Sequence, residues 1–255
     1  QWTANGVRLT NTSSTPSGLV IAPDNAGGAV IAWHENRSTH SDIYVQRVDA
    51  SGTALWAADG LNITGGEASN NNQTQPSIYA DANDIVVSWT DQREGGANSR
   101  EVGIWAQKLN WSGVDQWTQY GIKIVNNAQA ENNSRVITDG SGGFWFVFDD
   151  EANAYAYRVT LQKVNSAGVL QFGAAGILAG NYTGNNAYLR DAISDGAGGI
   201  ILAWDEFRTK QELYVQRLDG SGTKLWGNNG TAVSAGVLTE QALTPKLSPD
   251  GASGV

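Results

Sequence analysis

The chain has 255 residues, of which 40% are hydrophobic and 16% are charged, a composition that provides for a packed core and argues against disorder. Its formal net charge of −9 excludes the basic surface that nucleic-acid binding needs, and an anionic membrane surface would repel it. No apolar run approaches the ~20 residues that cross a bilayer, which excludes membrane insertion. The absence of cysteine excludes disulfides and cysteine-ligated zinc, and no cofactor is expected.

A pattern of apolar residues ending in Trp, an acidic residue and Arg recurs along the chain. It stands at 28–37 (GAVIAWHENR), 84–93 (DIVVSWTDQR) and 199–208 (GIILAWDEFR), and in weaker form at 143–152 (GFWFVFDDEA). A second element follows each copy, first as 43–56 (IYVQRVDASGTALW). Its closing aromatic residue lies at Trp2, Trp56, Trp117, Phe172 and Trp226, in steps of 54, 61, 55 and 54 residues. A period this regular indicates a repeat architecture.

Each repeat predicts four short strands. In the first copy, strand a covers 19–22, an Asp/Gly-rich turn covers 24–28, and strand b ends at Trp33. Strand c alternates apolar and polar residues from Tyr44, and strand d ends at Trp56. Four-stranded antiparallel units at a fixed period are typical of β-propeller blades, so we expect an all-β propeller. The alternative, a string of separate β-domains, is disfavoured because ~55 residues are few for independent folding.

The repeat boundaries predict one domain over 1–255 with four complete blades. These cover about 15–66, 74–127, 134–180 and 187–236. The ends predict a composite, incomplete fifth blade, with its strand d in 1–12 and its strand a in 243–255. Unpaired strand edges recruit a partner, so the two ends are expected either to pair or to have the missing strands supplied by another segment or chain. The sequence does not distinguish an excerpt of a longer protein from a ring that something else completes.

The repeat string, GGxIxAWxDxR followed by DIYVQRxDxSGxxxW, resembles repeats of large secreted surface proteins of Bacteroidetes and related bacteria. Those proteins often end in a type IX secretion sorting domain. The resemblance covers residues 2–255 and implies an extracellular or cell-surface bacterial location rather than an activity. A weaker similarity, carried by Asp49, Ser51, Gly52 and Trp56, connects strand d to the tryptophan-docking repeat of quinoprotein dehydrogenases, and we interpret it as shared turn mechanics.

Acidic and basic residues at the strand-b ends are the first site candidates. Three pairs stand two residues apart and therefore point to one face: Glu35/Arg37, Asp91/Arg93 and Glu206/Arg208. A repeat-wide pair more often serves the repeat, so ion pairs within the sheets are the favoured interpretation. The alternative is a polar ligand site, for which Arg37, Arg93 and Arg208 are the candidates. The third copy has uncompensated acid instead, and we name Asp149, Asp150 and Glu151 as the candidate cation site, against a solvated acidic loop.

Aromatic residues outside the regular repeat positions are the second group of candidates. Trp111, Tyr120, Tyr155, Tyr157 and Tyr182 are expected to be exposed, where rings stack on sugars or anchor protein partners. Two histidines, His34 and His40, have no recognisable nucleophile partner and are expected to be exposed loop residues.

The favoured functional interpretation is a non-enzymatic extracellular binding or scaffold module with a protein or glycan partner. The alternative is a carbohydrate-active enzyme like the glycosidases among five-bladed propellers, which use a carboxylate pair. Asp91, Asp150 and Glu206 are the residues that could provide such a pair. Catalytic blades usually diverge from their neighbours, whereas the first, second and fourth copies here are close to one another, which favours the non-enzymatic interpretation.

Overall fold

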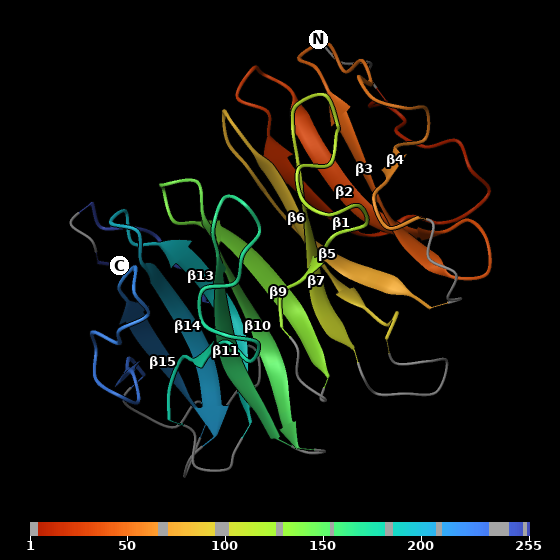
Figure 1. Cartoon of the computed structure of the whole chain (residues 1–255). Coiled ribbons are helices and arrows are strands. Elements are labelled where there is room, and N and C mark those ends of the chain that lie inside the picture. The colour runs from red at the N-terminus through yellow and green to blue at the C-terminus, as the bar shows by residue number, and fades with distance from the viewer. Residues whose placement is uncertain are drawn as a thin grey trace. The chain divides into compact units, whose positions relative to one another are not determined.

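The computed structural model describes residues 5–65, 71–94, 102–125, 130–153, 156–181, 186–207, 211–234, 245–251 and 254–255. Within these residues the regular elements are β-strands (Figure 1). The same residues contain no helix long and apolar enough to cross a membrane. The strands form four antiparallel sheets of four strands each, and in every sheet the strands follow one another in chain order.

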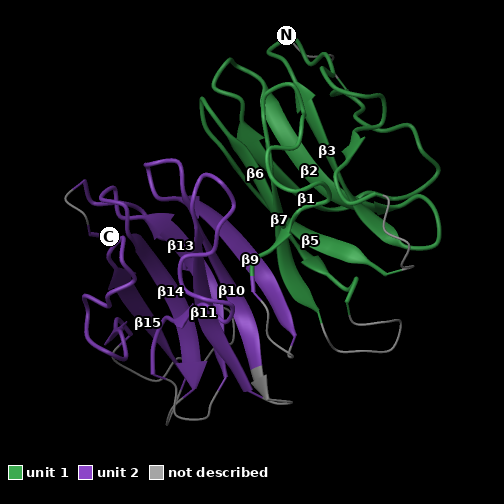
Figure 2. Ribbon diagram, viewed as in Figure 1, with its two compact units in different colours: residues 1–124 green, residues 125–255 purple. Residues whose placement is uncertain are grey.

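Two compact units divide the chain, residues 1–124 and 125–255, and each contains two of the sheets (Figure 2). We number the sheets blades 1 to 4. Blade 1 consists of β1 (Ser17–Pro23), β2 (Ala29–Asn36), β3 (Ser41–Val48) and β4 (Leu61–Asn62), and blade 2 of β5 (Gln73–Ala80), β6 (Ile85–Asp91), β7 (Gly103–Leu109) and β8 (Ile122–Lys123). Blade 3 consists of β9 (Glu131–Thr138), β10 (Phe144–Asn153), β11 (Ala156–Val164) and β12 (Ile177–Leu178), and blade 4 of β13 (Ala187–Ser194), β14 (Ile200–Phe207), β15 (Gln211–Leu218) and β16 (Thr231–Ala232).

The second strand of each blade is the most buried, because side chains on both of its faces are covered. In unit 1, Val30 and Ala32 of β2 pack in one cluster with Val87 and Trp89 of β6. In unit 2 the equivalent cluster joins β10 to β14. The recurring aromatic position holds fully buried side chains throughout, at Trp33, Trp89, Phe148 and Trp204. The side chains of the near-continuous apolar run in the second strand are thus buried on both faces of the blade.

A buried glutamine fastens the chain leading into the fourth strand of each blade. The amide of Gln46 in β3, which is 0% exposed, donates to the carbonyl of Ala57 at 2.8 Å. Its Oε1 accepts the backbone N–H groups of Arg47 and Trp56, each at 3.0 Å. Equivalent contacts are made by Gln107, Gln162 and Gln216. We call this arrangement the glutamine clamp. It satisfies three backbone groups without strand pairing.

The described parts of the two terminal segments lie against the blade nearest in sequence and contain no strand. Leu9 packs against the blade 1 cluster that includes Trp33. The N–H of Leu247 donates to Asp191 of β13 at 3.0 Å. Asp250 and Gly254 then form the turn that also joins the first two strands of blade 1, with Asp250 accepting the Gly254 N–H at 2.9 Å. The C-terminal segment therefore contains the turn that joins the first two strands of a blade.

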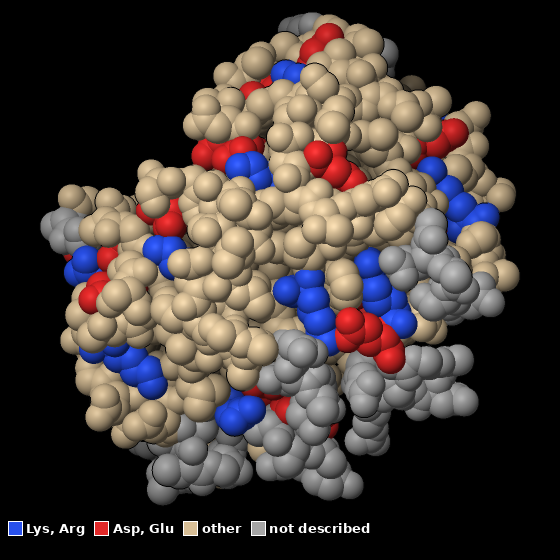
Figure 3. All heavy atoms as spheres, viewed as in Figure 1, with Lys and Arg blue, Asp and Glu red and all other residues tan. Residues whose placement is uncertain are grey.

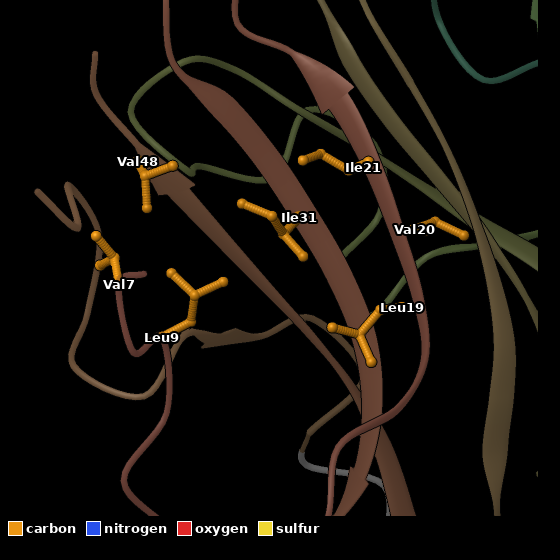
Figure 4. Close-up of a pocket in the computed structure, with 7 residues that line it drawn as sticks. All are labelled: Val7, Leu9, Leu19, Val20, Ile21, Ile31 and Val48. Atoms are coloured by element: carbon orange, nitrogen blue, oxygen red, sulfur yellow. The ribbon is translucent and has the colours of Figure 1, made fainter. Parts of the chain in front are cut away.

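Blade 1 carries an open hollow of about 300 Å³ beside the N-terminal segment (Figure 4). It is lined only by aliphatic side chains: Val7, Leu9, Leu19, Val20, Ile21, Ile31 and Val48. Ile21 is 68% exposed, whereas Val136 and Ala192, at the same register position of blades 3 and 4, are each 4% exposed. The side chains of this lining have no group that could take part in acid–base chemistry.

Candidate functional site

The acid–Arg pairs at the strand-b ends lie within single blades. Asp91 accepts the Trp89 indole N–H at 2.7 Å and pairs with Arg93 at 2.7 Å. The Arg93 guanidinium also lies 3.9 Å from the ring centre of Trp105. Glu35 holds Trp33 and Arg37 in the same way, and Arg37 lies over Tyr44. These contacts fix the core tryptophan of blades 1 and 2, and the ligand-binding assignment of Arg37 and Arg93 stays a prediction. Arg208 lies outside the described residues.

The aromatic candidates occupy different environments. Trp111 is half-buried, lies over Arg47 with 4.7 Å to the ring centre, and donates its indole N–H to Ala82 at 3.2 Å. Tyr120 has a left-handed backbone, with φ of 65°, and its carbonyl accepts from Arg93 at 3.2 Å. Tyr157 contacts Tyr188, with 5.4 Å between ring centres. Tyr155 and Tyr182 lie outside the described residues. Of these aromatic residues, Tyr157 alone is placed beside a cluster of buried charges.

The first strand of each blade changes register at, or directly beside, the buried aromatic residue of the second strand. In three blades the bulge contains a residue with left-handed φ, namely Gly18 at 61°, Gln75 at 53° and Asn133 at 54°. Bulges of this kind re-aim side chains and are common near active sites. In blade 3 the re-aimed side chain is an amide, and it points at a carboxyl group.

Asp149 of β10 is that carboxyl group, and it is 4% exposed. Its Oδ2 accepts from the Asn133 amide at 2.9 Å, and its Oδ1 accepts the backbone N–H of Leu189 in blade 4 at 2.7 Å. Burial nevertheless outweighs these hydrogen bonds and raises the pKa of Asp149 from 3.8 to about 6. Asp149 therefore holds a proton in mildly acidic solution, where an ordinary aspartate does not.

Asp205 occupies the equivalent position in β14 and has a different environment. Its Oδ1 accepts from the guanidinium of Arg190, and its Oδ2 accepts from the Gln211 amide at 2.7 Å. Burial, with added repulsion from Tyr157 and from the two aspartates, raises the pKa of the Tyr188 phenol. Arg190 is 33% exposed, so this group of side chains reaches the surface. We call it the Asp149 cluster and define it as Asn133, Asp149, Tyr157, Tyr188, Arg190 and Asp205.

Two carboxyl groups in contrasting environments are the usual arrangement for acid–base chemistry. One, Asp149, is desolvated and protonated well above the ordinary range, and the other, Asp205, is fixed by an ion pair. The candidate cation site does not converge, because the successive residues Asp149 and Asp150 point to opposite faces of β10. Among the described residues, no group of three or more His, Asp or Glu side chains is placed to hold a metal ion.

The carboxylates named in advance for glycosidase chemistry lie on the other face of their strands. Asp150 accepts from Arg158 and from Thr160, each at 3.0 Å. Glu206 accepts the Trp204 indole N–H at 3.1 Å, as Asp91 does from Trp89. These acids hold their own blades, and the sequence analysis did not single out Asp205.

The sequence does distinguish Asp149 and Asp205 at one position, which lies one residue before Asp150 and Glu206. The position that follows the buried aromatic holds His34, Thr90, Asp149 and Asp205, so acid appears there only in blades 3 and 4. The expectation that His34 is an exposed loop residue is wrong. It lies half-buried in β2, and burial lowers the pKa of its ring.

No family model matches this chain, and no curated protein matches it either. Solved structures do. A family 117 glycoside hydrolase from the marine bacterium Zobellia galactanivorans matches with a TM-score of 0.53 and 8% identity, over 91% of this chain and 74% of that one. A polysaccharide lyase, an ulvan lyase, matches with a TM-score of 0.62 and 13% identity, over 89% and 57%. A protein of unknown function from Dyadobacter fermentans matches with a TM-score of 0.54 and 11% identity, over 86% and 70%.

The fold is a β-propeller. The predicted all-β fold with four complete four-stranded blades is therefore confirmed. The chain spans little more than half the length of the ulvan lyase. The favoured functional expectation, a non-enzymatic binding or scaffold module, is overturned. The solved structures that this chain resembles include a glycoside hydrolase and a polysaccharide lyase, which favour the carbohydrate-active alternative.

Proposed function

We propose that the protein is a carbohydrate-active enzyme that hydrolyses glycosidic bonds at the Asp149 cluster. The observation that carries the proposal is the desolvated carboxyl of Asp149, with a pKa of about 6, beside a second carboxylate held by Arg190. Glycosidases place one protonated and one ionised carboxyl on either side of the scissile bond. The likeness of the fold to a glycoside hydrolase supports the reaction class, and its likeness to an ulvan lyase supports a glycan as the substrate.

Each residue of the cluster has a role that follows from its contacts. Asp149 donates its proton to the leaving glycosidic oxygen as the bond to the anomeric carbon breaks. Asn133 and the N–H of Leu189 orient the carboxyl group through the hydrogen bonds at 2.9 and 2.7 Å. Asp205, held by Arg190, provides negative charge for the developing oxocarbenium ion or activates the water that supplies the new hydroxyl. Tyr157 and Tyr188 offer ring faces for the adjoining sugar.

A polymeric substrate places the enzyme outside the cell, because a polysaccharide does not cross a membrane intact. The resemblance of the repeat to secreted surface proteins of Bacteroidetes supports the same location. On the face shown in Figure 3, Lys and Arg lie in small groups, several of them beside Asp or Glu. With a net charge of −9, this distribution favours an uncharged glycan over a polyanionic one.

The test is release of reducing ends from a panel of neutral polysaccharides, with ulvan as the polyanionic member. We expect activity on a neutral glycan that Asp149→Asn lowers by at least about a hundredfold, as loss of a general acid does. Glu94→Gln is the control, because its carboxylate is 51% exposed and pairs only with Lys123 in the structure described. An unsaturated product would show lyase chemistry and refute hydrolysis. Inactivity on the whole panel, or full activity of Asp149→Asn, would refute the proposal.

A further inference from the structure

A second hollow lies between blades 3 and 4, at the end of β10 where the strand begins. Its volume is about 340 Å³ and its lining is mostly polar, with Asp139, Ser141, Lys163, Asn165 and Ser221 among the lining residues. Asp149 lies six residues beyond the lining residue Gly143, roughly 20 Å along the strand at about 3.3 Å per residue. A ligand in this hollow would not touch the Asp149 cluster.

The hollow lies where blade 4 has a glycine, Gly220, at the repeat position that holds Trp111 in blade 2. The same position holds Ala50 in blade 1 and Ser166 in blade 3. In unit 1, Arg47 donates to the carbonyl of Trp111 at 3.4 Å. In unit 2, Lys163 donates to the carbonyl of Gly220 at 3.0 Å. The two carbonyls are thus equivalent, and the Trp111 indole packs over the Arg47 guanidinium. Gly220 has no side chain to place over Lys163, which lies over the Trp145 ring instead. Unit 2 therefore has a space open at the position that an aromatic ring fills in unit 1.

The chemistry of the lining suits an uncharged polyhydroxy ligand. Lys163 is 3.2 Å from Asp139, so the charges at the base of the hollow offset each other and attract neither an anion nor a cation strongly. Serine hydroxyls and an asparagine amide add donors and acceptors around this pair. The ring of Phe172 adds one apolar surface, packed on Trp145 with 5.5 Å between ring centres. An apolar surface with convergent polar groups is typical of small-molecule sites of this size.

We propose that this hollow binds a single sugar residue of a neutral glycan, at a second carbohydrate site separate from the Asp149 cluster. Such a site holds a polymer on the protein while another part of the same chain reaches the reactive carboxyl groups. It does not depend on catalysis and would persist in an inactive protein.

The test fills the hollow with the side chain that unit 1 already uses. Gly220 does not have a left-handed backbone, and a Cβ there would meet the Gly198 carbonyl at 3.3 Å, so Gly220→Trp requires a small local adjustment. The matched control is Ala50→Trp, at the equivalent and exposed turn position of blade 1. Binding of neutral di- to tetrasaccharides of arabinose, galactose and rhamnose is measured by saturation-transfer NMR and calorimetry, in an Asp149→Asn background.

We expect Gly220→Trp to weaken binding at least tenfold and Ala50→Trp to leave it unchanged. Should Gly220→Trp not fold, as judged by circular dichroism, Ser141→Tyr narrows the same hollow from the opposite turn and is expected to have the same effect. Oligosaccharide binding that neither filling variant weakens would refute the proposal, as would absence of binding by the Asp149→Asn protein. Either result leaves the proposed hydrolysis untouched, because that is judged by product formation.

Discussion

Asparagine in place of Asp149 is expected to stabilise the folded protein at neutral pH while it lowers the rate of glycan cleavage by at least about a hundredfold. The buried carboxyl is costly to ionise, and an amide of the same shape avoids that cost. The Leu189 N–H keeps its acceptor in the variant, since the asparagine side chain has a carbonyl oxygen at the Oδ1 position. Asn133 has to turn its own amide to offer its oxygen, which its terminal torsion permits.

The magnitude follows from the pKa of Asp149, which folding raises from 3.8 to about 6. The native state therefore binds more protons than the unfolded state between these two values, and stability falls as pH rises through that window. The change is about 2 pKa units, and at 1.36 kcal/mol per unit it amounts to about 3 kcal/mol. This stability is fully present below pH 3.8 and lost above about pH 6.

Urea denaturation followed by tryptophan fluorescence, from about pH 4 to about pH 8, gives the free energy of unfolding of both proteins. The difference between Asp149→Asn and wild type should grow with pH and level off above pH 6. Asp205→Asn is the matched control, because it removes the ion-pair partner of Arg190 at the equivalent position and should destabilise the protein. A difference that does not vary with pH, or a less stable Asp149→Asn at pH 8, would show that the burial argument is wrong.

Three further outcomes are expected. The rate of glycan cleavage should fall about tenfold per pH unit above about pH 6, as the Asp149 proton is lost, and a rate still rising at pH 8 would contradict its role as the acid. Asp91→Ala should lower the free energy of unfolding by about 3–5 kcal/mol, because it leaves Trp89 and Arg93 without their buried acceptor. Glu94→Gln, which removes an exposed ion pair, should lower it by less than about 1 kcal/mol. Equal losses of the two variants in urea denaturation would show that the buried ion pair is worth no more than the exposed one. Gly230→Ala should lower the free energy of unfolding by roughly 2–5 kcal/mol, because φ is +69° and a Cβ would lie 2.5 Å from the Trp204 ring. Gly140→Ala, at φ of +73° with nothing within 4 Å of the added Cβ, should lower it by only about 1–2 kcal/mol. Thermal denaturation of the two variants therefore separates backbone strain from steric overlap with the tryptophan.

The strands and the buried aromatic positions are predictable from the sequence because the same pattern recurs in four copies of the repeat. Trp33, Trp89 and Trp204 each end a β-branched run after a glycine-rich or aspartate-rich turn, and local pattern and tertiary burial agree there. The structural role of Glu35 and Asp91 likewise follows from spacing, since residues two apart on a strand share a face.

The Asp149 cluster was not predictable in the same way. Its geometry depends on a bulge in β9, where Asn133 has a left-handed backbone. A glycine at that position would have indicated the bulge in the sequence, but the residue is an asparagine. Which of two adjacent acids, Asp149 or Asp150, is reactive depends on the face each occupies and on what blade 4 places beside it. Both depend on how neighbouring repeats pack against each other, and the sequence pattern within one repeat does not predict that packing.

The glutamine clamp has a consequence for how such chains grow. Because Gln46 and its three equivalents grip backbone atoms alone, they place no demand on the side chains of the segment they hold. That segment differs in sequence from blade to blade, and the step between copies varies from 54 to 61 residues. A duplicated copy of the repeat therefore contains the glutamine that holds the segment before its own fourth strand, whatever the sequence of its loops. The second strands differ at the position after the buried aromatic residue, where blades 3 and 4 have Asp149 and Asp205.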